Sequence, residues 1–150
     1  MPDPSPNAWE DALIEDLRAN DGRPSSGPLA GHPLLVMTST GAKSGKPRRA
    51  ILTYTRDGDD YIVAGTKGGS PEDPLWIENI RVRPDVNIEI GTRAVPATAT
   101  IVNGEERDRL WDAHAAELPW FAPYPARTGR VIPMIRLTPV SERIVETGPM

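Results

Sequence analysis

Prolines punctuate this chain so densely that its secondary-structure elements are expected to be short. The sequence has 17 prolines among 150 residues. Proline lacks a backbone N–H and fixes its own φ angle, so it concentrates in turns and at the ends of elements. The chain is therefore expected to contain many turns that connect short helices and strands.

Six segments between these turns are typical of β-strands, because they are rich in β-branched and apolar residues. They cover residues 34–40, 49–56, 61–66, 86–90, 93–102 and 131–140. The turns at "DGDD" and at Gly91-Thr92 are tight, and strands joined by tight turns are antiparallel neighbours. Six such strands around a small core favour a barrel over an open sheet.

Three helices are also predicted: one over residues 8–18, before the first strand, and two between strands, over residues 74–83 and 104–118. Asp73 is expected to cap the second helix. Asn103, with Glu106 three residues later, resembles a capping box for the third helix. On that third helix, Trp111 is expected to face the core and His114 the solvent.

Composition excludes several classes of function. The chain has no cysteine, and its two histidines are far apart in sequence, so neither a thiol nucleophile nor a metal site is predicted. No apolar stretch is long enough to span a membrane, and the acidic N-terminus is unlike a signal peptide. The net charge of −4 makes nucleic acid an unfavourable partner. A single cytoplasmic domain is expected; the acidic face of the 8–18 helix disfavours anionic lipid, while peripheral contact with the inner membrane face stays open.

The segment "TSTGAKSGKPRR", residues 38–49, concentrates positive charge in this acidic protein. It does not fit the Walker phosphate loop, because three residues instead of four separate its glycines and Pro47 replaces the required Ser or Thr. A Gly/Ser turn between strands does expose backbone N–H groups, and Lys43 and Arg48 flank this one. The loop therefore suits a phosphate or carboxylate, with a solvated hairpin tip as the alternative.

A second glycine turn, Lys67-Gly68-Gly69, follows the strand at 61–66 and leads into a helix N-terminus, which favours anions. If both turns lie at the same end of a barrel, they meet one anion from two sides. An ordinary strand-to-helix connection is the alternative.

Aromatic residues gather in the Pro-rich segment "LPWFAPYPARTGR" at 118–130. Trp120, Phe121 and Tyr124 lie within five positions, and the prolines around them predict an ordered but non-helical segment. Rings on such a loop suit the wall of a pocket for a flat ligand. A cap over one end of the barrel is the alternative.

Three stretches, "LLVMTSTGAKSGKPRR", "DGDDYIVAGTKGGSPEDPLWIENIRVRPDVNIEIG" and "YPARTGRVIPMIRL", together resemble the deazaflavin-dependent nitroreductases, also called F420H2-dependent quinone reductases. The resemblance implies a mainly β split barrel with helices, of about six antiparallel strands and related to FMN-binding flavin oxidoreductases. This domain would cover residues 32–150, after a variable segment over 1–31 that carries the short amphipathic helix. The resemblance also implies coenzyme F420, a deazaflavin with a phosphate and a glutamate tail, as hydride donor.

The residues that the resemblance assigns to the cofactor lie in the two glycine turns, at the strand end before the second turn, or on the helix after it. They are Lys43, Ser44, Gly45, Arg48, Thr66, Lys67, Gly68, Trp76 and Asn79. Lys43 and Arg48 would hold the phosphate and the tail, with backbone donors from Ser44 and Gly45. Arg130 matches a family position with a structural role.

The residues expected around the substrate are Thr53, Leu118, Trp120, Phe121 and Tyr124. Family members often have tyrosine where this chain has Leu118 and Phe121, and a bulkier residue in place of Thr53. These departures count against nitroimidazole reduction. No side chain is expected to be an obligatory acid or base, and Tyr124 would donate a proton or orient the substrate.

The expected function is that of an oxidoreductase that transfers a hydride from reduced F420 to a small electron-poor acceptor: a quinone, an activated enone or a nitro compound. Two alternatives stay open. One is an FMN-dependent oxidoreductase of the same fold, because FMN also offers a phosphate to Lys43 and Arg48. The other is a non-catalytic carrier of an anionic cofactor or lipid. Both a monomer and a homodimer are compatible with the sequence.

Overall fold

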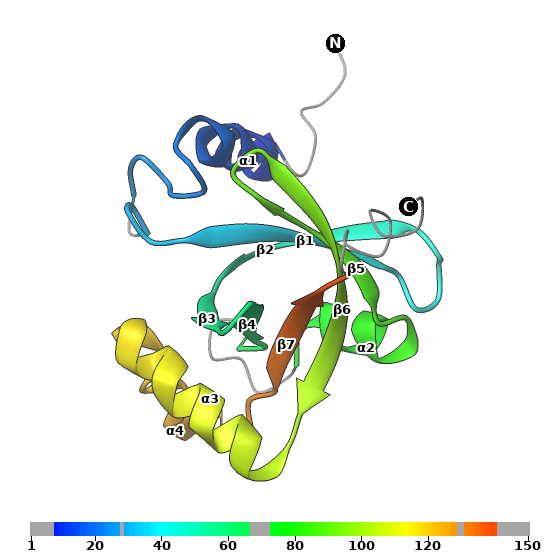
Figure 1. Ribbon diagram of the computed structural model, residues 1–150, viewed down its shortest axis with the longest axis vertical. Coiled ribbons are helices and arrows are strands. Elements are labelled where there is room, and N and C mark those ends of the chain that lie inside the picture. The colour runs from blue at the N-terminus through cyan, green and yellow to red at the C-terminus, as the bar shows by residue number, and fades with distance from the viewer. Residues whose placement is uncertain (1–7, 28, 67–72, 129–130, 141–150) are drawn as a thin grey trace, which may run out of the picture.

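The computed structural model describes residues 8–27, 29–66, 73–128 and 131–140. Its strands form one seven-stranded antiparallel sheet with the order β2-β1-β5-β6-β7-β4-β3, which curls into a split barrel (Figure 1). The strands are β1 (Leu34–Thr40), β2 (Pro47–Thr53), β3 (Thr55–Asp57), β4 (Asp60–Ala64), β5 (Asp85–Ile90), β6 (Arg93–Val102) and β7 (Met134–Pro139). The predicted fold class, a mainly antiparallel split barrel with helices, is confirmed.

One predicted strand, at 49–56, is two strands separated by Tyr54. β2 pairs with β1 at one edge of the sheet, whereas β3 pairs with β4 at the other edge. Because a single residue connects strands at opposite edges, the sheet has to curl until those edges meet. The main chain at Tyr54 therefore links the two edge strands and closes the barrel.

Four α-helices lie outside the sheet: α1 (Ala8–Ala19), α2 (Leu75–Val82), α3 (Gly104–Glu117) and α4 (Tyr124–Thr128). In Figure 1, α1 lies beside β1 while α3 and α4 lie together at the opposite end of the molecule. A 3₁₀ turn, Pro119–Phe121, joins α3 to the segment that leads into α4. None of the helices in the described part of the chain is long and apolar enough to cross a membrane.

The prediction of a non-helical aromatic segment was wrong for the described residues between 118 and 128. Pro119 begins the 3₁₀ turn, and Pro125 is the second residue of α4. Proline is tolerated in the first turn of a helix, where its missing N–H has no intrahelical partner to lose. The prolines in this segment therefore begin helices instead of preventing them.

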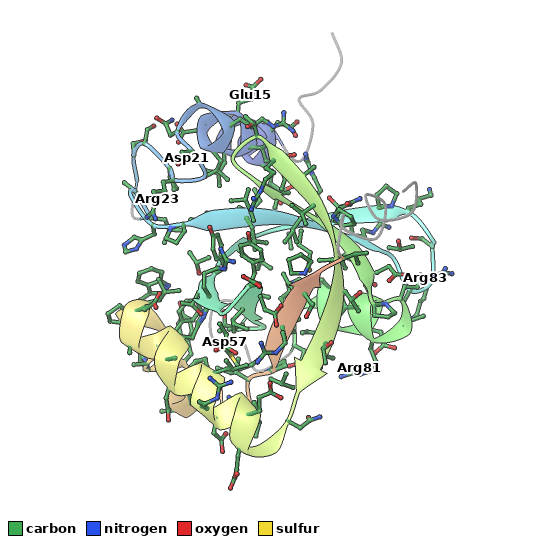
Figure 2. The ribbon with its side chains drawn as sticks, viewed as in Figure 1. Glu15, Asp21, Arg23, Asp57, Arg81 and Arg83 are labelled. Carbon is green, nitrogen blue, oxygen red and sulfur yellow. The ribbon has the colours of Figure 1, made fainter. Side chains whose placement is uncertain are left out.

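The core has three parts. The largest lies inside the barrel and is built from strand residues such as Met37 and Ile88, both fully buried. A second cluster joins α3 and the 3₁₀ turn to β4 and β7, and a third packs α1 onto β1. Charged side chains such as Glu15 and Arg83 lie on the outer surface (Figure 2).

Both predicted side-chain caps are absent. The N-cap of α2 is Pro74 and not Asp73, and it makes no side-chain cap hydrogen bond. Asn103 is the N-cap of α3 but also makes no such bond. The next residue, Gly104, has a φ of +64°, and this left-handed start to the helix differs from the helical geometry that a capping box requires.

His114 is buried, with 0% of its surface exposed, so the prediction that it faces solvent was wrong. Its Nδ1 lies 2.8 Å from the Thr55 hydroxyl oxygen, which links α3 to β3. Burial lowers the pKa of His114 from 6.5 to about 4, because the charged imidazolium would lose its hydration. The ring is therefore neutral at pH 7.

Candidate functional site

The basic loop between β1 and β2 is an ordered turn that is held together by hydrogen bonds between its own residues. The Gly41 amide donates a 2.8 Å hydrogen bond to the Lys46 carbonyl, and the Gly45 amide donates a 2.9 Å bond to the Gly41 carbonyl. The Ser44 hydroxyl oxygen accepts the Lys46 amide at 3.1 Å and the Arg48 guanidinium at 3.4 Å. Lys43 and Arg48 are both exposed. The loop thus presents two cations on a turn that is held by its own hydrogen bonds.

Helix α2 fixes this loop in place. The Ala42 amide donates a 2.9 Å hydrogen bond to the side-chain oxygen of Asn79, 37 residues later in the chain. Gly41 is buried, and a Cβ built at this position would lie 2.5 Å from the Ser44 hydroxyl oxygen. A side chain at position 41 would therefore displace the Ser44 hydroxyl, whose oxygen accepts the Lys46 amide.

A cavity of about 630 Å³ opens between the basic loop and α2. Three of its lining residues carry positive charge, namely Lys43, Arg48 and Arg49, against the single carboxylate of Glu78. The other lining residues are Gly41, Ala42, Ser44, Pro74, Leu75, Trp76 and Asn79. We call this space the cationic cavity, because its charges favour an anionic ligand.

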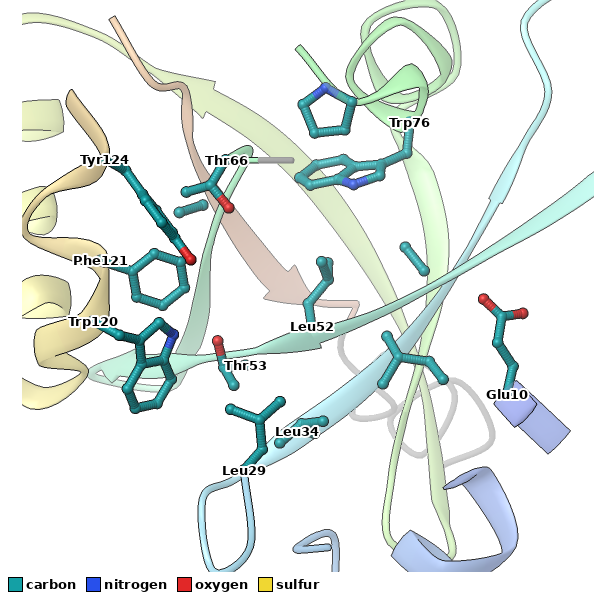
Figure 3. A pocket seen from close by; sticks show the side chains of 14 residues that line it. Glu10, Leu29, Leu34, Leu52, Thr53, Thr66, Trp76, Trp120, Phe121 and Tyr124 are labelled. Carbon is teal, nitrogen blue, oxygen red and sulfur yellow. The ribbon is translucent and has the colours of Figure 1, made fainter. Parts of the chain in front are cut away.

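A second cavity, of about 420 Å³, lies beside β2 and is mostly apolar. It is lined by Glu10, Leu29, Leu34, Ala50, Ile51, Leu52, Thr53, Ala64, Thr66, Pro74, Trp76, Trp120, Phe121 and Tyr124. In Figure 3 the three aromatic rings of Trp120, Phe121 and Tyr124 stand together on one side of it. We call this space the apolar cavity. Its volume and lining are those of a site for a small organic molecule.

Pro74 and Trp76 line both cavities, so the two spaces adjoin along the start of α2. Figure 3 shows the Trp76 ring on the side opposite the aromatic group. An extended ligand with a flat apolar part and an anionic tail would therefore lie in both cavities at once, with Trp76 beside the junction.

Most of the predicted site residues come together here. Among those predicted to bind cofactor, the cationic cavity is lined by Lys43, Ser44, Arg48, Trp76 and Asn79, and the apolar cavity by Thr66 and Trp76. Of those predicted around the substrate, Thr53, Trp120, Phe121 and Tyr124 line the apolar cavity. Lys67, Gly68 and Arg130 lie outside the described residues.

Two predicted residues lie elsewhere. Leu118 has 2% of its surface exposed and packs in the core cluster beneath α3, so it lines neither cavity. Gly45 has a φ of +70° and lines a separate groove beside β5. Its neighbour Ser44 remains at the edge of the cationic cavity.

Several lining residues were missed by the prediction. Arg49 was readable as part of the basic run, and Ala50, Ile51 and Leu52 continue the same strand. Glu10 and Leu29 had no such signal, because they reach the apolar cavity only through the packing of the N-terminal segment against β1.

Two histidines, His32 and His114, pack against the aromatic residues that line the apolar cavity. The Phe121 ring lies 5.5 Å from Tyr124 and 4.8 Å from the buried His114, measured between ring centroids. His32 packs edge-on against Trp120 at 4.8 Å. The wall is therefore fixed from both the α3 side and the N-terminal side.

Comparison with known proteins places this chain in one family. Residues 12–139 match the family described as F420H(2)-dependent quinone reductase. An F420H(2)-dependent quinone reductase of Mycobacterium tuberculosis (strain H37Rv) is 39% identical over 109 residues, which is 71% of this chain and 73% of that protein.

Two solved structures are also similar to this chain. A structure described as an F420-H2 dependent reductase is 35% identical with a TM-score of 0.65, and the match covers 70% of this chain and 93% of the other. A protein described as a domain-swapped dimer is 32% identical with a TM-score of 0.67, and the match covers 89% of this chain and 99% of the other.

Proposed function

Because the chain belongs to the F420H(2)-dependent quinone reductase family, we propose that it uses reduced coenzyme F420 to reduce a small electron-poor acceptor, with quinones as the first class to test. The observation that carries this proposal is the junction at Trp76 between an apolar and a cationic cavity. It matches a ligand with a flat ring at one end and a phosphate and glutamate tail at the other.

The residues of the cationic cavity fit the tail. Lys43 and Arg48 supply charge-assisted hydrogen-bond donors for a phosphate, and the Ser44 hydroxyl lies beside them in the lining of the cavity. The expected backbone donor at Gly45 instead bonds the Gly41 carbonyl. Asn79 holds this turn through the Ala42 amide. The geometry of the anion site is therefore set before the ligand arrives, which lowers the entropy cost of binding.

The residues of the apolar cavity fit the ring and an acceptor beside it. Thr66 is 9% exposed, lies two residues after β4 and supplies one of the few polar groups in the lining. Trp76 from α2 and Tyr124 from α4 stand on opposite sides of the cavity (Figure 3). When bound, the cofactor supplies the hydride, while these residues orient the reactants and exclude water.

Acceptor choice depends on the wall formed by Thr53, Trp120, Phe121 and Tyr124. Phe121 offers no hydroxyl, and Leu118 is withdrawn into the core. The wall presents ring surface together with the hydroxyls of Thr53 and Tyr124 and the indole N–H of Trp120, which suits a planar acceptor with carbonyl oxygens such as a quinone. Tyr124 orients the acceptor with its hydroxyl or donates a proton to it.

The experiment that tests the proposal is a titration of tryptophan fluorescence with F420 on wild-type protein and on a Lys43→Ala/Arg48→Ala variant. Loss of two charge-assisted contacts is expected to weaken binding by about 2–4 kcal/mol. Both side chains are exposed, so the fold should be retained.

The matched control is Lys46→Ala, which removes an exposed cation from the same loop that lines neither cavity. It should change the affinity by less than threefold. An unchanged affinity in the double variant would reject the anion site. Purified protein with a bound flavin spectrum, or tight F420 binding without turnover of any quinone, would favour the FMN enzyme or the carrier instead.

A further inference from the structure

We infer that Glu10 determines which acceptors the apolar cavity admits, favouring uncharged or cationic molecules over anionic ones; the inference rests on the proposed function. Glu10 belongs to α1, and its side chain lines the apolar cavity (Figure 3). The side chain is 16% exposed. A carboxylate is thus held in the wall of a cavity whose surface is otherwise mostly apolar.

Glu10 is the one formally charged side chain at neutral pH among the described residues that line this cavity. The others are aliphatic, proline, threonine or aromatic. Water would screen such a charge at the surface, but a ligand that fills the cavity displaces water. An anionic group placed there therefore meets stronger repulsion than it would in solution.

Arg49 compensates this charge only in part. Its Nη2 lies 3.5 Å from a Glu10 carboxylate oxygen, but its hydrogen bond goes to Asp11 at 2.9 Å. Two carboxylates around one guanidinium leave a local net charge of −1. The cations Lys43 and Arg48 lie in the other cavity, where the anionic tail of the proposed cofactor would neutralise them.

The position of Glu10 matters as much as its charge. In Figure 3 Glu10 stands at the end of the apolar cavity away from Trp120 and Tyr124. It comes from the N-terminal segment, whereas Trp76 and Thr66 come from the elements proposed to hold the cofactor. An acceptor that extends along the apolar cavity from the aromatic group therefore approaches the Glu10 carboxylate at the far end, and Glu10 selects by charge without contact to the reacting atoms.

The experiment compares wild type, Glu10→Gln and Asp11→Asn with a matched pair of quinones, menadione as the neutral probe and a naphthoquinone sulfonate as the anionic probe. Dissociation constants come from quenching of tryptophan fluorescence without cofactor, and for this measurement each protein also carries Lys43→Ala/Arg48→Ala, so that the empty cationic cavity does not capture the anionic quinone. KM values come from oxidation of reduced F420 by the proteins without these two changes. In Glu10→Gln, glutamine keeps the shape of glutamate but removes its charge. Thermal melting verifies that each variant is folded.

Glu10→Gln is expected to improve the Kd of the anionic quinone about tenfold relative to that of the neutral quinone. Asp11→Asn removes a charge from the same Arg49 cluster but not from the cavity wall, so it should leave this ratio within twofold of wild type. An equal change for both quinones, or the same change of ratio in Asp11→Asn, would overturn the inference. If the binding ratio shifts as expected but wild type oxidises no reduced F420, the proposed function fails and the charge selection stands.

Discussion

The Ala42 amide donates a 2.9 Å hydrogen bond to the Asn79 side-chain oxygen, and this contact joins the basic loop to the helix that follows β4. Both residues line the cationic cavity, so the bond fixes the distance between its two sides. The loop is otherwise exposed at Lys43, Ser44 and Gly45. The position of the loop therefore depends on few contacts, and the hydrogen bond to Asn79 is one that anchors it to another element.

Asn79→Ala should loosen the loop and weaken the binding of F420 by about tenfold, since one hydrogen bond of about 1 kcal/mol and the ordering of the loop are both lost. Hydrogen exchange of the 41–46 amides should accelerate in the same variant. Val82→Ala, on the exposed side of α2, is the control and should change neither quantity. Faster exchange with unaltered affinity would show that the loop position does not limit binding.

The Thr55–His114 contact predicts how stability depends on pH. The pKa of His114 is lowered by burial from 6.5 to about 4 in the folded protein. Between these values the unfolded chain binds a proton that the folded protein excludes. The free energy of unfolding should therefore fall by about 3 kcal/mol as the pH drops from about 6.5 to about 4.

Urea denaturation at several pH values measures this dependence. His114→Asn should flatten it over that range, while also lowering the stability at pH 7 because packing against Phe121 is lost. His32→Asn changes the other histidine of the chain and should leave the dependence in place. An equally steep loss of stability in His114→Asn would assign the effect to other groups.

Helix α3 shows how far sequence patterns reach. Its beginning and length were predicted within a residue or two, but His114 was assigned to solvent. The buried residues Leu110, Trp111, His114 and Leu118 recur at spacings of one, three and four, which is one face of a helix. The signal that His114 belongs to this face was thus present in the sequence, and the polarity of the residue concealed it.

The split at Tyr54 had no comparable signal. Thr53, Tyr54 and Thr55 all favour extended structure, so a single strand was the natural prediction. The division arises because β1 and β4, which lie next to opposite edges of the curled sheet, each pair with one half of the segment. Such a long-range choice is decided by the closure of the barrel and not by local propensity.

The residues of the candidate site also differ in whether the local sequence could predict them. The glycine-rich loop and the aromatic group were predictable, because turn chemistry and charge are local features. Glu10 was not, because α1 reaches the cavity only after it packs onto β1.

Arg136 on β7 ties three segments together. Its guanidinium lies 2.8 Å from carboxylate oxygens of Asp60 and Asp57, and 2.7 Å from Glu106 of α3. Its side chain is only 17% exposed. The hydrogen bond to Asp60 contributes most to raising the pKa of Arg136, against the opposing effect of burial. The network therefore joins the β3–β4 hairpin and α3 to the centre of the sheet.

Arg136→Met should lower the free energy of unfolding by about 2–3 kcal/mol, because it leaves several carboxylates close together without this cation. Thermal melting measures the effect, and added salt should reduce it. Arg81→Met is the control, since Arg81 pairs with Glu78 on the outer surface of α2 (Figure 2), and it should cost less than about 0.5 kcal/mol. Equal losses in the two variants would mean that burial of the Arg136 network contributes nothing.

The last prediction concerns the Tyr124 hydroxyl and tests whether it is an obligatory proton donor to the acceptor. The Tyr124 ring meets Phe121 edge-on at 5.5 Å, and the residue lines the apolar cavity. Tyr124→Phe keeps the ring and should leave F420 affinity within twofold of wild type. If the hydroxyl only orients the acceptor, kcat falls by less than about tenfold, since a positioned general acid is worth about a hundredfold or more. Tyr54→Phe, at the barrel closure, removes the hydroxyl of a tyrosine that lines neither cavity; it serves as control and should keep kcat and KM. A loss of kcat greater than a hundredfold, with cofactor affinity intact and the solvent isotope effect changed, would identify Tyr124 as an obligatory proton donor.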